Sequence, residues 1–370
     1  MGQEYIRTEE FSMSQQHLAH PNVSAPTSEW SESEVLHVAA CHINPFRWRT
    51  RRELTDDFRR HMMNSPNVKL HLIELAYGDR PWEVTNPSLY PDDIQVRTNT
   101  ELFHKENAMN LAVRHFPQGW KYGAIIDADL MFTRHDWALE TIHQLQHYDF
   151  VQMFSTYSHL SGKTLGTGHQ AIWSAPGFAF NYVKRGYRIP TGWGNGFTSP
   201  VTHPDGYEYS LKAAKKNAPE SPGAPGGAWA FTSSAFNTVG GMLDKCILGS
   251  GDHFMAFGLV GDEGKIDKEI GGYTQSYRNY IRAWQLRALQ LRRKIGYVDC
   301  HVIHHFHGPM RNRAYGTRDK ILVDNKYNPN TDVYYDWQGV LQLTPDKPVL
   351  RDAIRQYFLD RSEDEPQPRS

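Results

Sequence analysis

The feature that most constrains the fold is an apolar segment that runs directly into two carboxylates, Tyr122-Gly-Ala-Ile-Ile-Asp127-Ala-Asp129-Leu-Met-Phe132. A short apolar run predicts a buried strand, and ionised side chains at its end are costly unless a positive charge neutralises them. Mg²⁺ and Mn²⁺ commonly bind one or two carboxylates together with phosphate oxygens. We therefore expect a divalent cation at Asp127 and Asp129, with a nucleotide diphosphate carrying a leaving group as the ligand. The alternative is an ordinary strand end with two solvated aspartates.

Apolar and amphipathic segments alternate on both sides of this strand. The expected strands cover residues 35–40, 68–75, 94–97, 122–126 and 150–154, and the expected helices cover 51–63, 105–115 and 135–146. Such alternation predicts an α/β fold with a mostly parallel central sheet and helices packed on it. In open α/β sheets, ligands bind beyond the carboxyl ends of the strands. Asp127 and Asp129 lie at such an end.

The composition along the chain suggests one elaborated domain over residues 34–330, followed by a C-terminal extension over 331–360. Residues 1–33 and 361–370 are polar and weakly patterned, so we expect both to be flexible. Residues 155–226 are rich in Gly, Pro and aromatic side chains and are expected to form an irregular insertion. Five of its aromatic residues would form an acceptor platform, a lid or the core of a small subdomain: Trp173, Trp193, Phe197, Tyr207 and Tyr209.

Charge and cysteine content narrow the class of protein. The net charge is −1, so no overall positive field attracts nucleic acid or an anionic membrane. Cys41, Cys246 and Cys300 are an odd number without a CxxC pair, which argues against a disulfide framework or a cysteine-rich zinc site. No apolar run reaches the length of a membrane helix. We therefore expect a soluble, cytosolic protein with reduced thiols and no membrane partner; its oligomeric state stays open.

A third acidic residue, Asp252, lies in the second of two glycine-rich segments. Gly226-Gly-Ala-Trp-Ala-Phe-Thr232 predicts a strand after a turn, and Leu248-Gly-Ser-Gly-Asp252-His-Phe-Met255 predicts a turn that delivers Asp252 to the start of a helix. Asp252 is then either a helix N-cap or a general base that deprotonates an acceptor hydroxyl.

A strand-like run dense in histidines follows, Tyr297-Val-Asp-Cys-His-Val-Ile-His304-His-Phe-His307-Gly308. A continuous strand would put His305 and His307 on one face and His304 on the other. The chain has no cysteine partners for these histidines and no HExxH helix, so zinc is disfavoured. One of the histidines would complete the metal shell begun by Asp129.

In its order of motifs, the chain resembles the inverting nucleotide-sugar glycosyltransferases of the GT-A fold, a Rossmann-like α/β architecture. The segment Phe103-His-Lys105-Glu-Asn-Ala-Met-Asn110 is similar to one that precedes the acidic strand in the β-1,4-galactosyltransferases, and the polypeptide N-acetylgalactosaminyltransferases are a second comparison. Asn44-Pro-Phe-Arg-Trp48, Lys105-Glu-Asn107 and His304-His-Phe-His-Gly308 also resemble elements of putative glycosyltransferases encoded by tailed bacteriophages.

This resemblance implies a metal-dependent transferase that uses Mn²⁺ or Mg²⁺ and a nucleotide-diphosphate sugar, with a UDP-sugar first. It implies Asp252 as the catalytic base, and Asp127, Asp129, His304 and His307 as metal ligands, with His304 favoured over His307. Lys105 and an arginine of the Arg311-Asn-Arg313 segment would neutralise phosphate charge, unless they lie on a solvated surface. The implied nucleotide-binding residues are Asn44, Phe103, Lys105, Asn110, Asp127, Arg311 and Arg313. Where the galactosyltransferases have Trp-Gly-Gly-Glu-Asp, this chain has Gly249-Ser-Gly-Asp252-His253, so the acid before the base is missing.

The remaining hypotheses differ in the molecule that would accept the sugar. It is either a glycan or, as the phage resemblance implies, a hydroxymethylated pyrimidine of DNA in a bacterial or phage-infected cell. Residues 277–294 combine apolar side chains at helical spacing with several arginines, which predicts a helix packed on the domain or a basic strip that meets phosphates. Two other functions stay open: a nucleotidyl- or phosphotransferase with the same metal site, and a non-catalytic sugar-binding or virion protein that retains the fold.

Overall fold

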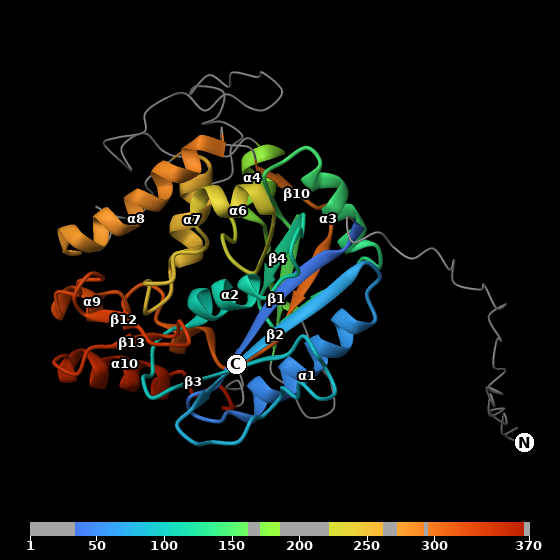
Figure 1. Ribbon diagram of the computed structural model, residues 1–370. Coiled ribbons are helices and arrows are strands. Elements are labelled where there is room, and N and C mark those ends of the chain that lie inside the picture. Colours follow the sequence, from blue (N-terminus) through green and yellow to red (C-terminus); the bar gives the residue numbers. More distant parts are fainter. Residues whose placement is uncertain (1–33, 162–170, 186–221, 262–271, 292–294, 366–370) are drawn as a thin grey trace, which may run out of the picture.

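The structure is a computed structural model that describes residues 34–161, 171–185, 222–261, 272–291 and 295–365 (Figure 1). Its centre is a seven-stranded sheet of order β10-β6-β9-β4-β1-β2-β3. Neighbouring strands are parallel except where β9 pairs with β4 and β6. The prediction of a mostly parallel α/β sheet is therefore confirmed. The strands are β1 (Leu36–Ile43), β2 (Val68–Tyr77), β3 (Ile94–Thr98), β4 (Tyr122–Ile126), β6 (Phe150–Gln152), β9 (Ala228–Thr232) and β10 (Ile295–Tyr297).

Helices cover both faces of this sheet, because successive residues of a buried strand point to opposite sides. In β4, Ile125 belongs to one hydrophobic core, whereas Ala124 and Ile126 belong to the other. The Ile125 core contains side chains of α2 (Lys105–Arg114), α6 (Ser233–Val239), α7 (Gly251–Leu259) and α8 (Gln275–Ala288). The opposite core contains side chains of α1 (Arg49–Met63) and α3 (Trp137–Leu145).

A second, four-stranded sheet of order β5-β11-β7-β8 lies next to the acidic motif. It consists of β5 (Leu130–Phe132), β11 (His301–His304), β7 (Thr156–Leu160) and β8 (Ala171–Pro176). β5 runs antiparallel to β11, with Leu130 opposite His304. The backbone N–H of His305 also donates to the carbonyl oxygen of Asp129 at 2.9 Å. This pairing brings the histidine segment to Asp129.

The stretch expected to be an irregular insertion, 155–226, contains regular structure in its described part. β7, β8 and α4 (Phe178–Val183) all fall within it. The remainder, 162–170 and 186–221, lies outside the described residues, as do the aromatic side chains expected to form an acceptor platform or lid.

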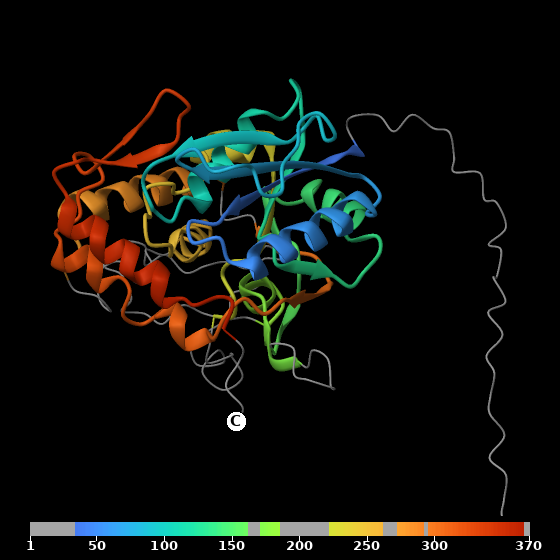
Figure 2. The same cartoon turned by 90° about the horizontal axis from the view of Figure 1, so that it is seen from below.

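The C-terminal part packs beside α2 and forms one side of the molecule in Figures 1 and 2. It contains the 3₁₀ turn η4 (Met310–Arg313), α9 (Lys320–Asp324), β12 (Val333–Tyr335), β13 (Leu341–Leu343) and α10 (Pro348–Asp360). The side-chain amide of Asn107 donates to the carbonyl oxygen of Gly339 at 3.1 Å, and its oxygen accepts from the N–H of Leu341 at 3.0 Å. These contacts hold the β12–β13 hairpin against α2.

The prediction of a flexible tail from residue 361 is wrong for residues 361–365. Glu363 is buried, and Asp364 accepts hydrogen bonds from the backbone N–H groups of Arg49 at 2.9 Å and Thr50 at 2.8 Å. These N–H groups begin α1, where carboxylates are stabilised by the unsatisfied donors and the helix dipole. The charged side chains that suggested flexibility instead bind the N-terminal turn of α1. Residues 366–370 lie outside the described part.

The basic segment after Tyr277 forms the packed helix α8, as its spacing predicts. Ile281 and Trp284 are buried, and the indole N–H of Trp284 donates to the carbonyl oxygen of Gly241 at 2.6 Å. Arg287 and Arg278 donate to backbone carbonyl oxygens, of Val239 and Tyr273. α8 continues into the 3₁₀ turn η3 (Leu289–Leu291), and 292–294 are outside the described residues.

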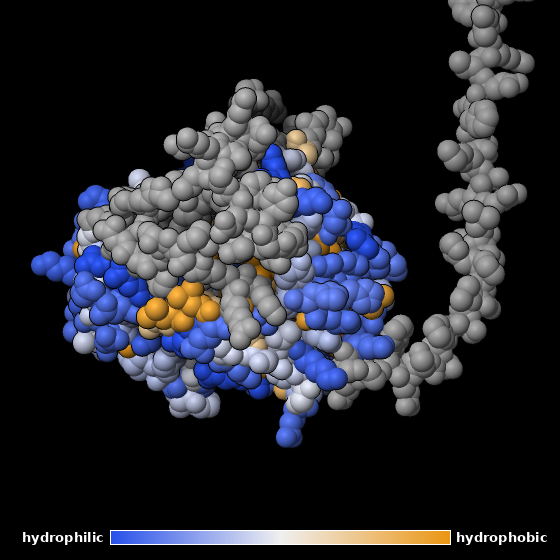
Figure 3. All heavy atoms as spheres, turned by 90° about the horizontal axis from the view of Figure 1, so that it is seen from above, coloured by the Kyte–Doolittle hydropathy of each residue, from blue (hydrophilic) through white to orange (hydrophobic). Residues whose placement is uncertain are grey.

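The three cysteines, Cys41, Cys246 and Cys300, are all free thiols, in agreement with the prediction. On the face seen in Figure 3, the described surface is largely hydrophilic. Within the described ranges, no helix combines the length and the apolar character needed to cross a bilayer.

Candidate functional site

A cavity of about 800 Å³ lies beyond the carboxyl ends of β1 and β4. It is lined by Cys41–Ile43 at the end of β1, the acidic segment after β4, the start of α2 and the start of α7. Its volume falls in the range of small-molecule binding sites, and its position is the one expected for ligands of an open α/β sheet. The structure thus gathers most of the predicted site residues around one cavity.

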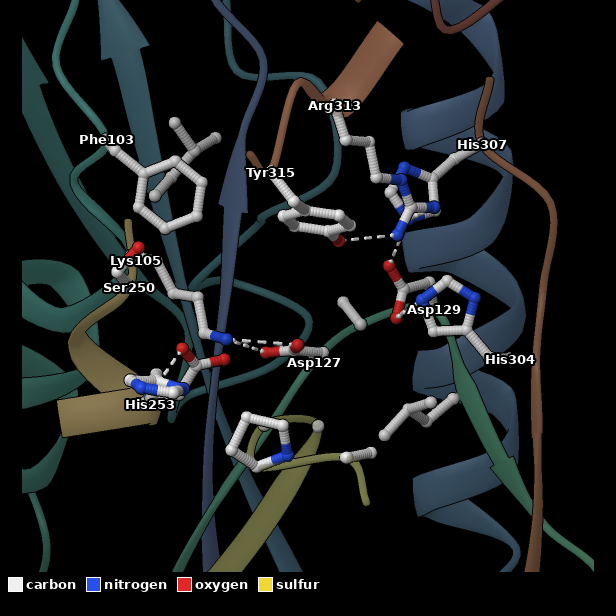
Figure 4. A pocket seen from close by; sticks show the side chains of 18 of the residues that line it. Phe103, Lys105, Asp127, Asp129, Ser250, His253, His304, His307, Arg313 and Tyr315 are labelled. Atoms are coloured by element: carbon white, nitrogen blue, oxygen red, sulfur yellow. Dashed lines mark hydrogen bonds and ion pairs between the residues drawn. The ribbon is translucent and has the colours of Figure 1, made fainter. Parts of the chain in front are cut away.

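Asp127 pairs with Lys105 rather than with the histidines. Nζ of Lys105 lies 2.7 Å from Oδ1 and 3.0 Å from Oδ2 of Asp127 (Figure 4). Burial alone would lower the pKa of Lys105, but Asp127 and Asp252 outweigh it and raise that pKa above its usual range. Lys105 therefore remains a cation that faces the cavity.

Asp129 forms a cluster with two histidines. Its Oδ2 lies 2.9 Å from Nε2 of His307, and its Oδ1 lies 3.7 Å from Nε2 of His304. One ligand atom from each residue falls within 4.8 Å of the others. Figure 4 shows Asp129 pointing toward these histidines and Asp127 pointing toward Lys105.

The expectation that His304 and His307 face opposite sides is wrong. β11 ends at His304, so the two-residue alternation of a strand does not continue to His307. The chain then turns, and both rings approach the same carboxylate, with 5.2 Å between their centroids. Both predicted histidines therefore belong to the cluster, whereas Asp127 does not.

The cluster has the chemistry of a cation site. Nε2 of His307 lies 2.9 Å from a carboxylate oxygen of Asp129 and 2.8 Å from Nη2 of Arg313. One ring nitrogen cannot donate to the former and accept from the latter at once. Oδ1 of Asp129 is buried without a hydrogen-bond partner. A divalent cation between the two residues would accept a lone pair from Nε2 of His307 and another from Oδ1 of Asp129.

The protonation states suit this role. Burial lowers the pKa of His304 well below its usual value, so its ring is neutral near pH 7. Burial alone would raise the pKa of Asp129, but His304, His307 and Arg313 outweigh it and hold that pKa well below its usual value. A neutral imidazole and an ionised carboxylate are the forms that bind metal. The two aspartates are thus paired, partly buried groups and not solvated acids.

Asp252 lines the cavity from the first turn of α7. Ser250, with a φ of +69°, occupies the N-cap position of that helix, so the N-cap interpretation of Asp252 is wrong. Oδ1 of Asp252 accepts from the N–H of His253 at 2.8 Å. A Cβ added to Gly226 would lie 2.1 Å from Oδ2 of Asp252, so any larger residue at this position would displace the carboxylate. Figure 4 places His253 across the cavity from Asp129.

Three predicted nucleotide-binding residues, Asn44, Asn110 and Arg311, do not line the cavity. The side chain of Asn44 bonds to Trp48 and Glu83 and holds the turn after β1. Asn110 bonds to the backbone of Met242 through both side-chain atoms, at 2.8 and 3.1 Å. Both asparagines therefore shape loops.

Arg311 is exposed on η4, whereas Arg313 is buried and lines the cavity. Arg313 donates to the hydroxyl of Tyr315 at 3.1 Å and contacts His307. Phe103, in the loop before α2, also lines the cavity. Of the two arginines proposed for the phosphates, only Arg313 is in position.

Sequence reasoning missed several residues at this site. Glu363 reaches it from the C-terminal segment, where two arginines, Arg51 and Arg361, bind its carboxylate. Glu106 lines the cavity beside Lys105, and burial raises its pKa from 4.5 to about 8. The ring centroid of His159, on β7, lies 4.2 Å from that of His304. Proximity of Glu106 to the Lys105 motif was the only sequence signal for any of them.

Comparisons with known proteins give limited similarity. No protein-family model and no curated protein matches the chain. Among solved structures, a mutant of Drosophila β-1,4-galactosyltransferase 7 in complex with manganese, UDP-Gal and xylobiose is 13% identical, with a TM-score of 0.33, over 85% of this chain and 98% of that one. The catalytic domain of the same Drosophila enzyme with xylobiose is 11% identical, with a TM-score of 0.33, over 86% and 98%. At this identity and TM-score, the geometry of the site has to identify its chemistry.

Proposed function

We propose that the protein is a metal-dependent glycosyltransferase that moves a sugar from a nucleotide-diphosphate sugar to an acceptor hydroxyl, with inversion at the anomeric carbon. One observation carries the proposal. A carboxylate–imidazole cluster, Asp129 with His304 and His307, and a separate carboxylate, Asp252, line one cavity at the carboxyl ends of parallel strands. The first arrangement suits a cation that binds a diphosphate, and the second suits a general base.

The charges of the cavity favour an anionic ligand once a cation is bound. Five basic and five acidic side chains line it. Because the pKa of Glu106 is raised to about 8, this acid is largely neutral at pH 7, which leaves the basic groups in excess. A divalent cation would add to that excess. The basic residues are Arg51, Lys105, Arg313, Arg318 and Arg361, and the acidic residues are Glu106, Asp127, Asp129, Asp252 and Asp319.

The donor site would stabilise the leaving group. Glycosyl transfer breaks the bond between the anomeric carbon and a phosphate oxygen through a transition state with oxocarbenium character, and negative charge grows on the departing diphosphate. A cation held by Asp129, His304 and His307 would supply Lewis-acid stabilisation of that charge. Arg313 and Lys105 are the adjacent fixed cations that bind the remaining phosphate oxygens.

Asp252 would act on the acceptor. Its carboxylate takes the proton from the attacking hydroxyl while the new glycosidic bond forms and the anomeric carbon–phosphate bond breaks. The products are a glycoside of inverted configuration and a nucleoside diphosphate. Because Gly226 has no side chain, the Asp252 carboxylate has room to stand in the cavity wall.

We extend the same proposal to the identity of the metal, the donor and the acceptor. Two imidazoles beside one carboxylate favour Mn²⁺ over Mg²⁺, which prefers oxygen ligands. A UDP-sugar is the donor we propose first. The acceptor is a glycan or a hydroxymethylated base of DNA. Arg278 and Arg287 of α8 each donate to a backbone carbonyl group, which ties two arginines of the predicted basic strip to the protein.

The direct test measures nucleoside diphosphate released from a panel of nucleotide sugars in the presence of Mn²⁺. We expect release from at least one donor and its loss in Asp129→Ala. The exposed carboxylate of Asp324, which pairs with Lys320 on α9, provides a matched control in Asp324→Ala, which should keep full activity. No release from any donor, or equal release by Asp129→Ala, would reject the transferase proposal.

Product identity separates the competing functions. A nucleotidyltransferase would release pyrophosphate or a nucleoside monophosphate, and a non-catalytic sugar-binding protein would bind donors without turnover. Binding to hydroxymethylated DNA, plain DNA and oligosaccharides across salt concentrations then tests the acceptor. Indifference to both DNAs at low salt would leave a glycan as the acceptor class.

A further inference from the structure

The C-terminal segment Arg361–Asp364 binds to the N-terminus of α1 and lies next to His307 of the predicted metal cluster. Asp364 accepts from the N–H groups of Arg49 and Thr50 at the start of α1. Glu363 receives two hydrogen bonds from Arg51, the next residue in the same helix, at 2.6 and 2.7 Å. The segment is therefore anchored to α1 at two consecutive residues.

The segment also packs directly behind the histidine turn. Gly308, which follows His307, has a φ of +89°. A Cβ at this position would lie 2.9 Å from Cα of Glu363 and 3.0 Å from the carbonyl oxygen of Arg361. Only a glycine therefore allows the two chain segments to approach this closely.

This approach brings a buried carboxylate to the far side of a metal-ligating imidazole. Oε2 of Glu363 lies 3.7 Å from Nδ1 of His307, whose Nε2 faces Asp129. The side chain of Glu363 is fully buried, and Nδ1 of His307 is buried without a hydrogen-bond partner. Arg51 and Arg361 both bind this carboxylate, at 2.6 and 2.8 Å, so the group next to Nδ1 is a carboxylate held by two cations.

In metal sites, a ligating histidine commonly donates its second ring N–H to a carboxylate, which fixes the tautomer and strengthens the ligand. A proton on Nδ1 of His307 would give that nitrogen a partner in Glu363 and leave Nε2 with a lone pair directed at Asp129. A contraction of less than about 1 Å would turn the 3.7 Å separation into a hydrogen bond.

We propose that Glu363 is a positioning residue for the metal ligand His307, so that docking of Arg361–Asp364 and metal binding stabilise each other. The inference rests on the metal centre of the proposed function. Because coupling between two binding events is reciprocal, loss of the Glu363 carboxylate weakens the metal site, and metal binding holds the segment more firmly on α1.

The first experiment measures Mn²⁺ affinity by calorimetry in the full-length chain. Glu363→Gln should weaken binding by about 10- to 100-fold and alter the visible absorption spectrum of bound Co²⁺. Glu365→Gln, two residues on at an exposed position, is the matched control and should change neither. A Glu363→Gln protein that melts normally and binds Mn²⁺ within twofold of the unmodified protein would overturn the proposal.

A double variant separates positioning from charge pairing. If Glu363 only balances the charge of Arg51 and Arg361, then Arg51→Gln combined with Glu363→Gln keeps the same local net charge and should bind Mn²⁺ as tightly as the unmodified chain. We expect the double variant to stay weak, because His307 still lacks its carboxylate. Restored affinity would reject the positioning role.

The unmodified protein offers a test that does not depend on folding of a variant. Mn²⁺ should slow amide hydrogen exchange of residues 361–365, while the β12–β13 hairpin serves as the internal reference and stays unchanged. Equal exchange of 361–365 with and without bound Mn²⁺ would reject the coupling while leaving the metal centre intact. Failure of the unmodified protein to bind Mn²⁺ or Co²⁺ would reject both this inference and the proposed metal centre.

Discussion

Replacement of Glu106 by Gln should make the protein more stable at alkaline pH. Glu106 is 1% exposed, and its Oε2 has no hydrogen-bond partner. Burial, reinforced by Asp252 and opposed by Lys105, raises its pKa from 4.5 to about 8. The folded chain therefore holds this proton more tightly than the unfolded chain does.

The sign and size follow from that difference in pKa. Below pH 4.5 the carboxyl is protonated in both states, so its ionisation does not affect the free energy of unfolding. As the pH rises toward about 8, the unfolded chain ionises freely while the folded chain resists, and stability falls by about 1.4 kcal/mol per pH unit. Over the whole interval the loss amounts to about 5 kcal/mol. Glu106→Gln lacks this loss, since its amide does not titrate.

The assay is urea denaturation of both proteins at intervals from pH 4 to pH 9, in EDTA so that metal binding adds nothing to stability. The free energy of unfolding of the variant minus that of the unmodified chain should rise with pH and level off above pH 8. Any constant cost of burying the amide shifts the curve without changing its shape. Glu365→Gln, at an exposed position, should give a flat difference. A flat difference for Glu106→Gln would refute a raised pKa at this site.

Three further substitutions test separate parts of the site. Gly226→Ala should abolish sugar transfer but keep Mn²⁺ affinity, because the new Cβ would lie 2.1 Å from Oδ2 of Asp252 and push that carboxylate aside. Retained turnover would count against Asp252 as the base. Lys105→Met should weaken donor binding, measured by calorimetry, by at least tenfold because it removes the cation bound to Asp127; unchanged affinity would exclude a phosphate contact. Asn110→Ala should lower the free energy of unfolding by about 1–3 kcal/mol with the KM for donor unchanged, whereas a raised KM would return it to the nucleotide site.

The sequence predicts the parallel core well because the signals there are local. β4 covers Tyr122–Ile126 as expected, and β1 and β2 extend their predicted ranges by only a few residues. Apolar runs of this kind are buried on both faces and leave little choice of conformation. The position of Asp127 and Asp129 at a carboxyl strand end follows directly.

The second sheet could not be predicted in the same way. β5 and β11 are only three and four residues long, and their pairing depends on partners far apart in the sequence. Periodicity says nothing about such pairing. The distinct roles of Asp127 and Asp129 depend on it, because β11 delivers His304 to Asp129 while α2 delivers Lys105 to Asp127.

Individual polar residues were the least predictable. Asn44 and Asn110 occupy motif positions, yet Asn44 bonds to the backbone of the turn at Trp48, a common use of asparagine. Asn110, on α2, bonds instead to the backbone of Met242, which is 132 residues away in the sequence. Arg311 and Arg313 differ by two positions on η4, and only one points inward. Glu363 sits in a charged segment whose composition suggests disorder, and its burial depends on Arg51 in the first helix.

The N-terminus of α1 is capped by Asp364, a residue far away in the sequence, and this has a consequence for biosynthesis. The opening N–H groups of α1 are made first, and Asp364, which accepts their hydrogen bonds, follows them by 314 and 315 residues. Asp129 likewise waits for His304 and His307. A nascent chain can therefore assemble β1, β2 and β4 long before it can hold an ion. The proposed metal centre could therefore form only after the histidine segment and Glu363 have been made, and termination before Glu363 would leave that centre weakened.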